Sequence, residues 1–228
     1  MQLENIQVEY RKRKTFLIKV LPCTTVKVIA PRKANLLIIQ ELIRRRADWI
    51  DKKRKFYASC EYLNRKYAYQ NGEEFLHLGR KYALELILSK REYAEVDGPI
   101  LKVYSKHPEN PTKSAMLIEK WYKEEAAKVF EERISEHSLT IAPFHRKSIV
   151  LKQRNMKQQW GSCSTSGKIT LNTQLIKTPL ECIDFVIMHE LCHLVVMNHS
   201  KRFYAVMNSM MPDWKIRQAK LKMYTCYY

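Results

Sequence analysis

The residues best suited to chemistry are two histidines and a glutamate near position 190. In the segment His189-Glu190-Leu191-Cys192-His193, the two imidazoles stand four positions apart, so a helix would present both on one face. The surrounding residues, CIDFVIMHELCHLVVM, are apolar on nearly every side and predict a buried helix from about 180 to 197. Buried imidazoles need partners. A divalent metal would satisfy both, with Glu190 beside an open coordination position for water.

A third histidine follows at a useful distance. Asn198 is a residue type that tolerates left-handed backbone and often ends a helix. A stop there would turn the chain and bring His199 back toward the metal, and Ser200 could cap the next helix. The sequence therefore predicts three ligands, His189, His193 and His199, with the fourth position left for water. That arrangement is typical of catalytic zinc, whereas structural zinc more often recruits cysteines and closes all four positions.

The N-terminal half of the chain alternates strand-like and helical segments. Strands are expected over residues 6–30, a helix capped by Asn35 over about 36–57, and strands again over 75–105. Pro108 and Pro111 then mark a break. We expect a division there, into a strand-rich region with one basic helix over 1–110 and a metal-binding catalytic region over 111–228, the two forming one compact unit.

The C-terminal half is expected to be mainly helical around one short β-segment. A long helix should run from Thr112 to about 137, with an apolar stripe that indicates core packing: Ile118, Trp121, Tyr122, Ala126, Val129, Phe130 and Ile134. Residues 148–172 are predicted to form a hairpin with Gly167 in its turn. Two further helices are expected, over about 200–210 and after Asp213. The resulting class is α+β.

Charge is the most unusual feature of the composition. Lys plus Arg number 41 and Asp plus Glu 23, a formal charge of +18, which favours polyanionic partners such as nucleic acid or nucleotides. The basic run from Arg44 to Lys55 on the first helix could contact phosphates, or it is simply a solvated face. The sequence has no Gly-rich phosphate loop of the Walker or Rossmann type. Disorder of the whole chain is excluded, because 46% of the residues are hydrophobic.

The first residues lack the apolar core of a signal peptide, and no apolar run reaches 18 residues. The six cysteines contain no C-x-x-C pair. We therefore expect a reduced, cytoplasmic protein with no membrane partner.

The motifs together resemble the YgjP-like zinc metallopeptidase family. The resemblance is close over about residues 144–222 and looser over the N-terminal strands and the long helix. The matching residues are Arg154, Trp160-Gly161-Ser162-Cys163-Ser164, Leu171-Asn172, Leu175, Pro179, Ile183-Asp184-Phe185-Val186, His189-Glu190-Leu191, His193, Asn198-His199-Ser200, Phe203 and Pro212. The layout is also similar to that of the DNA-associated WLM and SprT-like proteases. Metzincins share the histidine spacing but have Gly at the position of Val196.

The resemblance implies a zincin-like fold, in which a small mixed sheet packs on the active-site helix. It implies one zinc ion held by His189, His193 and His199, with Glu190 activating the zinc-bound water as general base and then acid. The segment Trp160-Gly161-Ser162-Cys163 is expected on a strand beside the cleft, either to hold an extended substrate or only for packing.

Several other residues are candidates for supporting roles. Arg154, Tyr204 and His145 are candidates for stabilising an oxyanion. Asp184 and Asp213 are candidate hydrogen-bond partners of the metal-binding imidazoles, although Asp184 is better explained as a charge near the helix start.

Three functions fit these features. The first is a zinc-dependent peptidase acting on peptides or proteins. The second is a zinc-dependent hydrolase of nucleotide phosphoanhydrides or another small anionic substrate, suggested by the positive charge. The third is a DNA-associated protease or a basic DNA-binding module.

Overall fold

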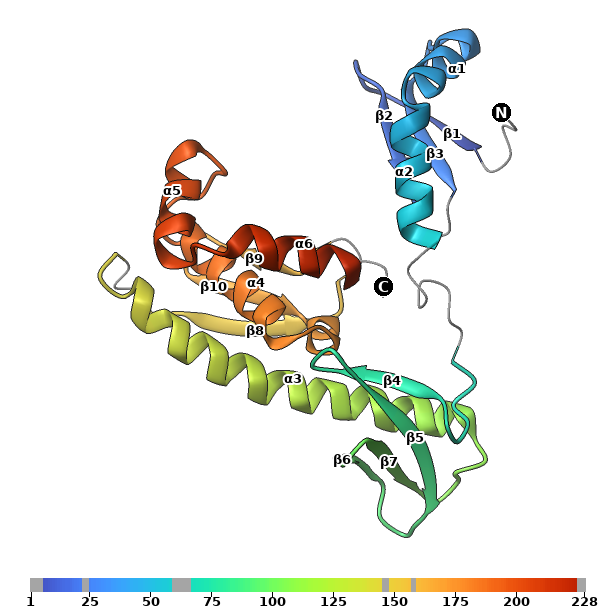
Figure 1. Ribbon diagram of the computed structural model, residues 1–228, viewed down its shortest axis with the longest axis vertical. Helices are drawn as coiled ribbons and strands as arrows, with labels where there is room; N and C mark the ends of the chain where they lie inside the picture. Colours follow the sequence, from blue (N-terminus) through green and yellow to red (C-terminus); the bar gives the residue numbers. More distant parts are fainter. Residues whose placement is uncertain (1–5, 22–24, 59–66, 145–147, 157–158, 225–228) are drawn as a thin grey trace. The chain divides into compact units, whose positions relative to one another are not determined.

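The computed structural model describes residues 6–21, 25–58, 67–144, 148–156 and 159–224 (Figure 1). The chain divides into two compact units, the first within residues 1–66 and the second over Tyr67–Tyr224. Each unit has its own cluster of buried hydrophobic side chains. None of the described helices is both long and apolar enough to cross a bilayer.

The first unit is a three-stranded sheet with two helices. Its elements are β1 (Ile6–Arg11), β2 (Leu17–Val20), β3 (Val26–Pro31), α1 (Leu36–Arg45) and α2 (Ala47–Ala58). Strand β3 is central, parallel to β1 and antiparallel to β2. Alternate residues of β3, such as Val26 and Val28, are buried with Ile39 and Ile43 of α1, because successive side chains of a strand point to opposite faces.

The single helix predicted over 36–57 is instead two helices. The backbone of Arg46 leaves the helical region, and its N–H bonds to Ile43 and Arg44 carbonyls. The prediction of an Asn35 cap is confirmed, because the Asn35 side chain accepts a hydrogen bond from Leu37 N at 3.0 Å. The break lets Ile50 of α2 reach the same buried cluster as Ile43.

The second unit begins with a four-stranded sheet in the order β4-β5-β7-β6. The strands are β4 (Glu74–His77), β5 (Arg80–Leu88), β6 (Tyr93–Asp97) and β7 (Ile100–Ser105), and the long helix α3 (Pro111–Ile141) follows. The division of the chain differs from the predicted boundary at 110/111. Leu101 and Val103 of β7 are fully buried in the same cluster as Phe130 of α3, so these strands belong to the second unit.

The segment predicted as a hairpin over 148–172 forms a three-stranded mixed sheet in the order β8-β10-β9. Its strands are β8 (Val150–Arg154), β9 (Gly161–Cys163) and β10 (Lys168–Asn172). The hairpin is confined to β9 and β10, with Gly167 at φ +83° in the turn, while β8 pairs in parallel on the other side of β10. A short 3-10 helix, η1 (Thr173–Lys177), follows.

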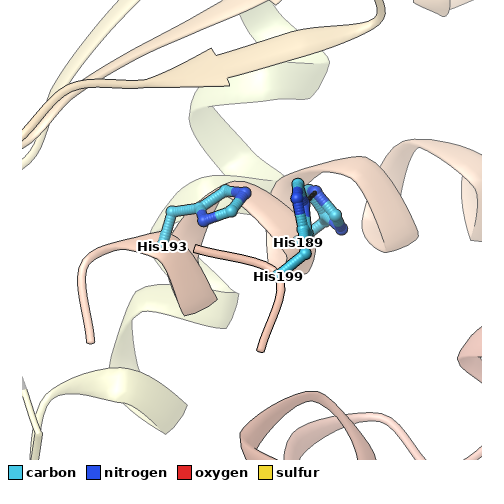
Figure 2. A group of neighbouring side chains, drawn as sticks. All are labelled: His189, His193 and His199. Carbon is cyan, nitrogen blue, oxygen red and sulfur yellow. Dashed lines mark hydrogen bonds between the residues drawn. The ribbon is translucent and has the colours of Figure 1, made fainter. Parts of the chain in front are cut away.

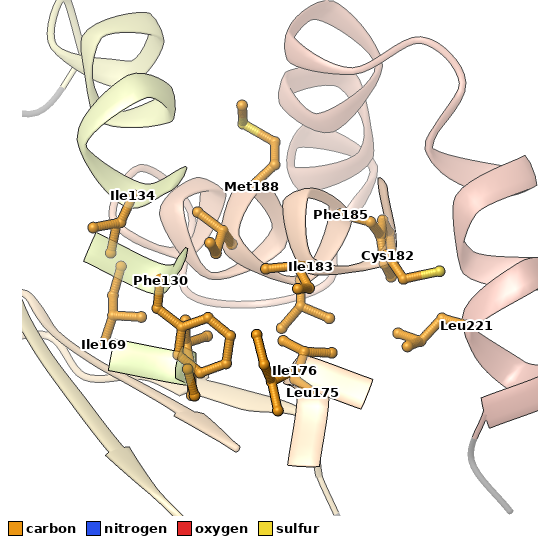
Figure 3. Close-up of a cluster of buried hydrophobic side chains, with 14 of the residues drawn as sticks. Phe130, Ile134, Ile169, Leu175, Ile176, Cys182, Ile183, Phe185, Met188 and Leu221 are labelled. Carbon is orange, nitrogen blue, oxygen red and sulfur yellow. The ribbon is translucent and has the colours of Figure 1, made fainter. Parts of the chain in front are cut away.

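Three helices complete the second unit: α4 (Leu180–His193), α5 (Lys201–Met210) and α6 (Trp214–Tyr224). Helix α4 lies at the centre of the core, where Ile183 and Ile187 are fully buried. Figure 3 shows side chains of α3, the η1 turn and α6 around it. A small mixed sheet packed on a buried helix confirms the predicted α+β class.

A tight approach fixes the start of α4 against the β4–β5 turn. Gly79 has a φ of +77°, and an added Cβ would lie 2.6 Å from Cγ of Pro179. We expect Gly79→Ala to destabilise the protein by about 3 kcal/mol, because the left-handed backbone and the clash both oppose the methyl group. Gly98→Ala is the matched control: its φ is +56°, but nothing lies within 4 Å, so we expect a loss of about 1 kcal/mol. Equal losses in urea unfolding would contradict this explanation.

Candidate metal centre

The three predicted histidines come together at the end of α4 (Figure 2). His189 and His193 are one turn apart on the helix, and His199 lies in the segment that follows it. One ligand atom from each lies within 4.8 Å of the others. The Nε2 atoms of His189 and His199 are 3.0 Å apart. Three imidazole nitrogens that converge in this way are a donor set suited to zinc.

The chain turns back earlier than predicted. Helix α4 ends at His193 with Leu194 as its C-cap, not near Asn198. The N–H groups of Val195 and Val196 both bond to the Cys192 carbonyl. Ser200 occupies the expected N-cap position of α5, but its side chain makes no capping hydrogen bond. The early end matters for the site, because Nδ1 of His193 lies 3.2 Å from the Val196 carbonyl. A proton on Nδ1 leaves Nε2 with a free lone pair for a metal.

Burial favours the neutral form of His189 and His193. His193 is 8% exposed and His189 is half-buried. Burial, helped by the neighbouring His193 and His199, lowers the pKa of His189 to about 4. Burial also lowers the pKa of His193. Neutral imidazole is the form that binds a metal ion, so at pH 7 these side chains are ready to act as ligands.

Phe203 supports all three imidazoles, a role that sequence reasoning missed. Its ring is completely buried, and its centroid lies 5.0 Å from that of His189, 4.6 Å from that of His193 and 4.8 Å from that of His199. The sequence did carry a signal for this contact. Phe203 is an aromatic residue four positions after His199, on the first turn of the helix that follows.

Glu190 is buried against strand β9. Only 5% of Glu190 is exposed, and burial raises its pKa to about 7. A Cβ atom added to Gly161 would lie 2.6 Å from Oε1 of Glu190 and 3.0 Å from its Cδ. The backbone of β9 therefore lies directly against this carboxyl group, and only glycine leaves room for it.

The remaining residues of the Trp-Gly-Ser-Cys segment surround this contact. Trp160 is half-buried against the main core, and Ser162 and Cys163 lie on β9. Burial, with a smaller contribution from the charge of Glu190, raises the pKa of Cys163 to about 11, so its thiol is protonated at pH 7 and is a poor nucleophile. Asn172 anchors the segment, since its side-chain NH₂ donates to the carbonyls of Met156 and Gln159.

The three oxyanion candidates differ in position. Tyr204 lies on α5 with its ring centroid 6.4 Å from that of His199, and it stacks on Trp214 at 5.4 Å. Arg154 is exposed at the end of β8. His145 lies outside the described residues.

The two candidate aspartates, Asp184 and Asp213, bond to side chains other than the three histidines. Asp184 accepts hydrogen bonds from Nε and Nη2 of Arg133, at 2.6 and 3.0 Å, and lies 3.1 Å from Nε2 of His137. Asp213 accepts from Nε of Arg217 at 2.8 Å. Nδ1 of His193 instead lies next to the backbone carbonyl of Val196. Asp184 thus ties α4 to α3.

This aspartate should give the fold a pH dependence. Burial alone would raise the pKa of Asp184, but hydrogen bonds from His137 and Arg133 outweigh it and hold the pKa below its usual value. The ionised form therefore stabilises the fold above about pH 4, and this stability is lost as the pH falls through the lowered pKa.

We expect Asp184→Asn to reduce the free energy of unfolding by about 3 kcal/mol at pH 7, because the partly buried Arg133 loses its buried carboxylate partner and keeps only the more exposed Glu136. At pH 3 the difference from wild type should be much smaller. Urea unfolding at the two pH values measures it, and the exposed Asp213→Asn is the control, with an expected loss below about 1 kcal/mol. A difference that is the same at both pH values would contradict the assignment.

Comparison with known proteins agrees with the geometry. The family model described as "YgjP-like, metallopeptidase domain" matches residues 14–224. The comparison with curated proteins finds no match. Among solved structures, the metallopeptidase zymogen jannalysin of Methanocaldococcus jannaschii aligns with 40% of this chain and 92% of its own, at 20% identity and a TM-score of 0.36. Because the family model spans nearly the whole chain, the protein belongs to the YgjP-like family and is a metallopeptidase.

Proposed function

We propose that the chain is a zinc-dependent peptidase in which His189, His193 and His199 hold one zinc ion and Glu190 is the general base. The observation that carries the proposal is the convergence of three imidazoles, with ligand atoms within 4.8 Å of one another, next in sequence to a buried carboxyl group. When bound, zinc would polarise the scissile carbonyl and lower the pKa of water to about 7. The donor set fits, because all three ligands are imidazoles and the fourth position stays open.

The chain's own residues then handle the proton. Glu190 takes a proton from the attacking water and returns it to the leaving amine. Its position is set by the backbone at Gly161, which packs against the carboxyl group. Among the oxyanion candidates, the proposal favours Tyr204, because its ring centroid lies 6.4 Å from that of His199. Tyr204 is held in place on α5, which the completely buried Phe203 anchors to the core.

Strand β9 offers a place for an extended substrate. It is the edge strand of the sheet β8-β10-β9, so one side of its backbone is not paired within that sheet. An edge strand can bind an extended peptide through backbone hydrogen bonds. Because Gly161 of β9 lies against Glu190, a peptide bound there would have its backbone near the general base. This strand edge is the feature that favours a peptide over a nucleotide as the substrate.

The test is cleavage of an unfolded protein, such as casein, by the full chain after reconstitution with zinc. We expect fragments with new amino termini, loss of cleavage with a zinc chelator, and recovery when zinc is added back. Nucleoside triphosphates are assayed in parallel. Hydrolysis of triphosphates without cleavage of any peptide would overturn the peptidase proposal in favour of a phosphoanhydride hydrolase. The cytoplasmic location stays a prediction.

A further inference from the structure

The positive charge of the chain is concentrated in its first unit. Residues 1–66 contain 17 Lys and Arg against 6 Asp and Glu, a formal charge of +11 out of the +18 of the whole chain. The remaining 162 residues carry only +7. The catalytic unit is therefore the less basic part, and the metal centre does not explain the charge.

The register of the sheet brings two basic segments together. Strands β1 and β3 are parallel and end in register, with Arg11 opposite Pro31. The residues that follow each strand therefore leave the sheet at the same end. Arg11 is the last residue of β1, Lys12 to Lys14 follow it, and Arg32 and Lys33 follow β3. We call these six residues the basic end of the first unit. The two segments that form it are about 20 positions apart in sequence.

Most of this charge is not neutralised. Arg11 pairs with Glu9, which also holds Lys27 at 2.8 Å. Among the residues that the structure describes, Lys12, Lys14, Arg32 and Lys33 form no ion pair, and all four are exposed. Four exposed cations without acidic partners at one end of a small sheet repel each other, and a polyanion would relieve that repulsion.

A further exposed cation lies on the face of the sheet that is turned away from the helices. Val26 and Val28 of β3 face the helices, so Lys27, which lies between them, faces the other side. Lys19 of β2 is opposite Lys27 in the register and is exposed. Because Lys27 is paired with Glu9, Lys19 is the cation that this face adds to the basic end. Cations spread over the end and one face of the sheet, instead of lying in one plane, suit a linear polyanion better than a flat lipid surface.

The helix run that the sequence suggested is a weaker candidate. Arg44 and Arg45 both pair with Glu41, and Lys55 pairs with Asp51. The run is also interrupted at Arg46, where α1 ends. These acids lower the charge that this face offers to a phosphate backbone.

We propose that the first unit binds nucleic acid through the phosphate backbone, with the basic end and the face of the sheet turned away from the helices as the contact surface. Binding of this kind depends on counterion release, so it is strongly salt-dependent and independent of base sequence. The inference does not rest on the peptidase activity, and it holds for a catalytically inactive chain.

The test uses the full chain and a labelled 25-base-pair DNA duplex, with binding followed by fluorescence anisotropy from 50 to 250 mM KCl. We expect a Kd on the order of micromolar to tens of micromolar near 100 mM KCl. Neutralising the basic end with Lys12→Gln, Lys14→Gln, Arg32→Gln and Lys33→Gln should weaken binding at least about tenfold. The slope of log K against log salt should fall by about 3 to 4.

A matched control removes the same charge from exposed positions of the second unit: Lys90→Gln, Arg91→Gln, Lys106→Gln and Lys113→Gln. We expect its Kd to stay within about twofold of wild type, since these residues are not part of the contact surface. Circular dichroism melting checks that both variants are folded. Equal weakening in the two variants would show a net-charge effect and overturn the proposal. So would binding to phosphatidylserine vesicles without binding to DNA, or no DNA binding at 50 mM KCl.

Discussion

Replacing Glu190 with Gln is expected to abolish peptide hydrolysis while zinc and the fold are retained. Gln has nearly the same shape and fills the same space beside Gly161, but it cannot accept a proton. General acid–base catalysis contributes about 10²- to 10⁴-fold, and Glu190 is proposed to act in two proton transfers. We therefore expect kcat to fall by at least about 10³-fold, with little change in KM. The measurement is steady-state cleavage of a fluorogenic peptide by zinc-loaded protein.

Glu181→Gln is the matched control for this variant. Glu181 lies on the same helix, but its carboxylate pairs with Lys220 on α6. We expect its activity to stay within about twofold of wild type, because the pair is partly exposed and Glu181 lies about two helical turns from His189 and Glu190 on α4. Full activity of Glu190→Gln with bound zinc would contradict the general-base assignment.

Gly161→Ala should nearly inactivate the enzyme without removing a catalytic group. Its added methyl group would lie 2.6 Å from Oε1 of Glu190, so the carboxyl group or strand β9 must move. Misplacement of a reacting group by about 1 Å can cost about 10²-fold in rate. We expect kcat to fall by about that factor while zinc content is unchanged, since the three atoms nearest to the added methyl group all belong to Glu190 and none to a histidine.

Two comparisons separate this effect from general damage to the strand. Ser162→Ala, the next position on β9, should leave kcat within about threefold of wild type. In the Glu190→Gln background, Gly161→Ala should cause no further loss, because two changes that act through one group are not additive. A full additional loss in the double variant would mean that Gly161 acts independently of Glu190.

The triad was predictable because its chemistry is local. His189 and His193 are one helical turn apart, and the periodicity of α4 alone sets their shared face. The place where the chain turns was not predictable in the same way. Asn198 looked like the helix end, but Val195 and Val196 already bond to the Cys192 carbonyl. Residue preferences at a helix end are weak compared with such local backbone pairing.

The predictions that the structure corrects concern contacts between residues far apart in the sequence. Strand β8 reads as one arm of a hairpin, yet it pairs in parallel with β10, with Val150 opposite Lys168. Nothing in local composition distinguishes these partners. The same holds for the unit boundary, because only the burial of Leu101 beside α3 shows that strand β7 belongs to the catalytic unit. The contact of Gly161 with Glu190 joins a strand and a helix 29 positions apart, and it too needed the structure.

The central claim, a zinc ion held by three histidines, is tested most directly by elemental analysis of the purified chain. Wild type, His193→Ala and the control His107→Ala, an exposed histidine before α3, are reconstituted with zinc and then freed of loosely bound metal. The account predicts about one zinc per chain in wild type and in the control, and close to none in His193→Ala. No bound zinc in wild type, or full retention in His193→Ala, would contradict it.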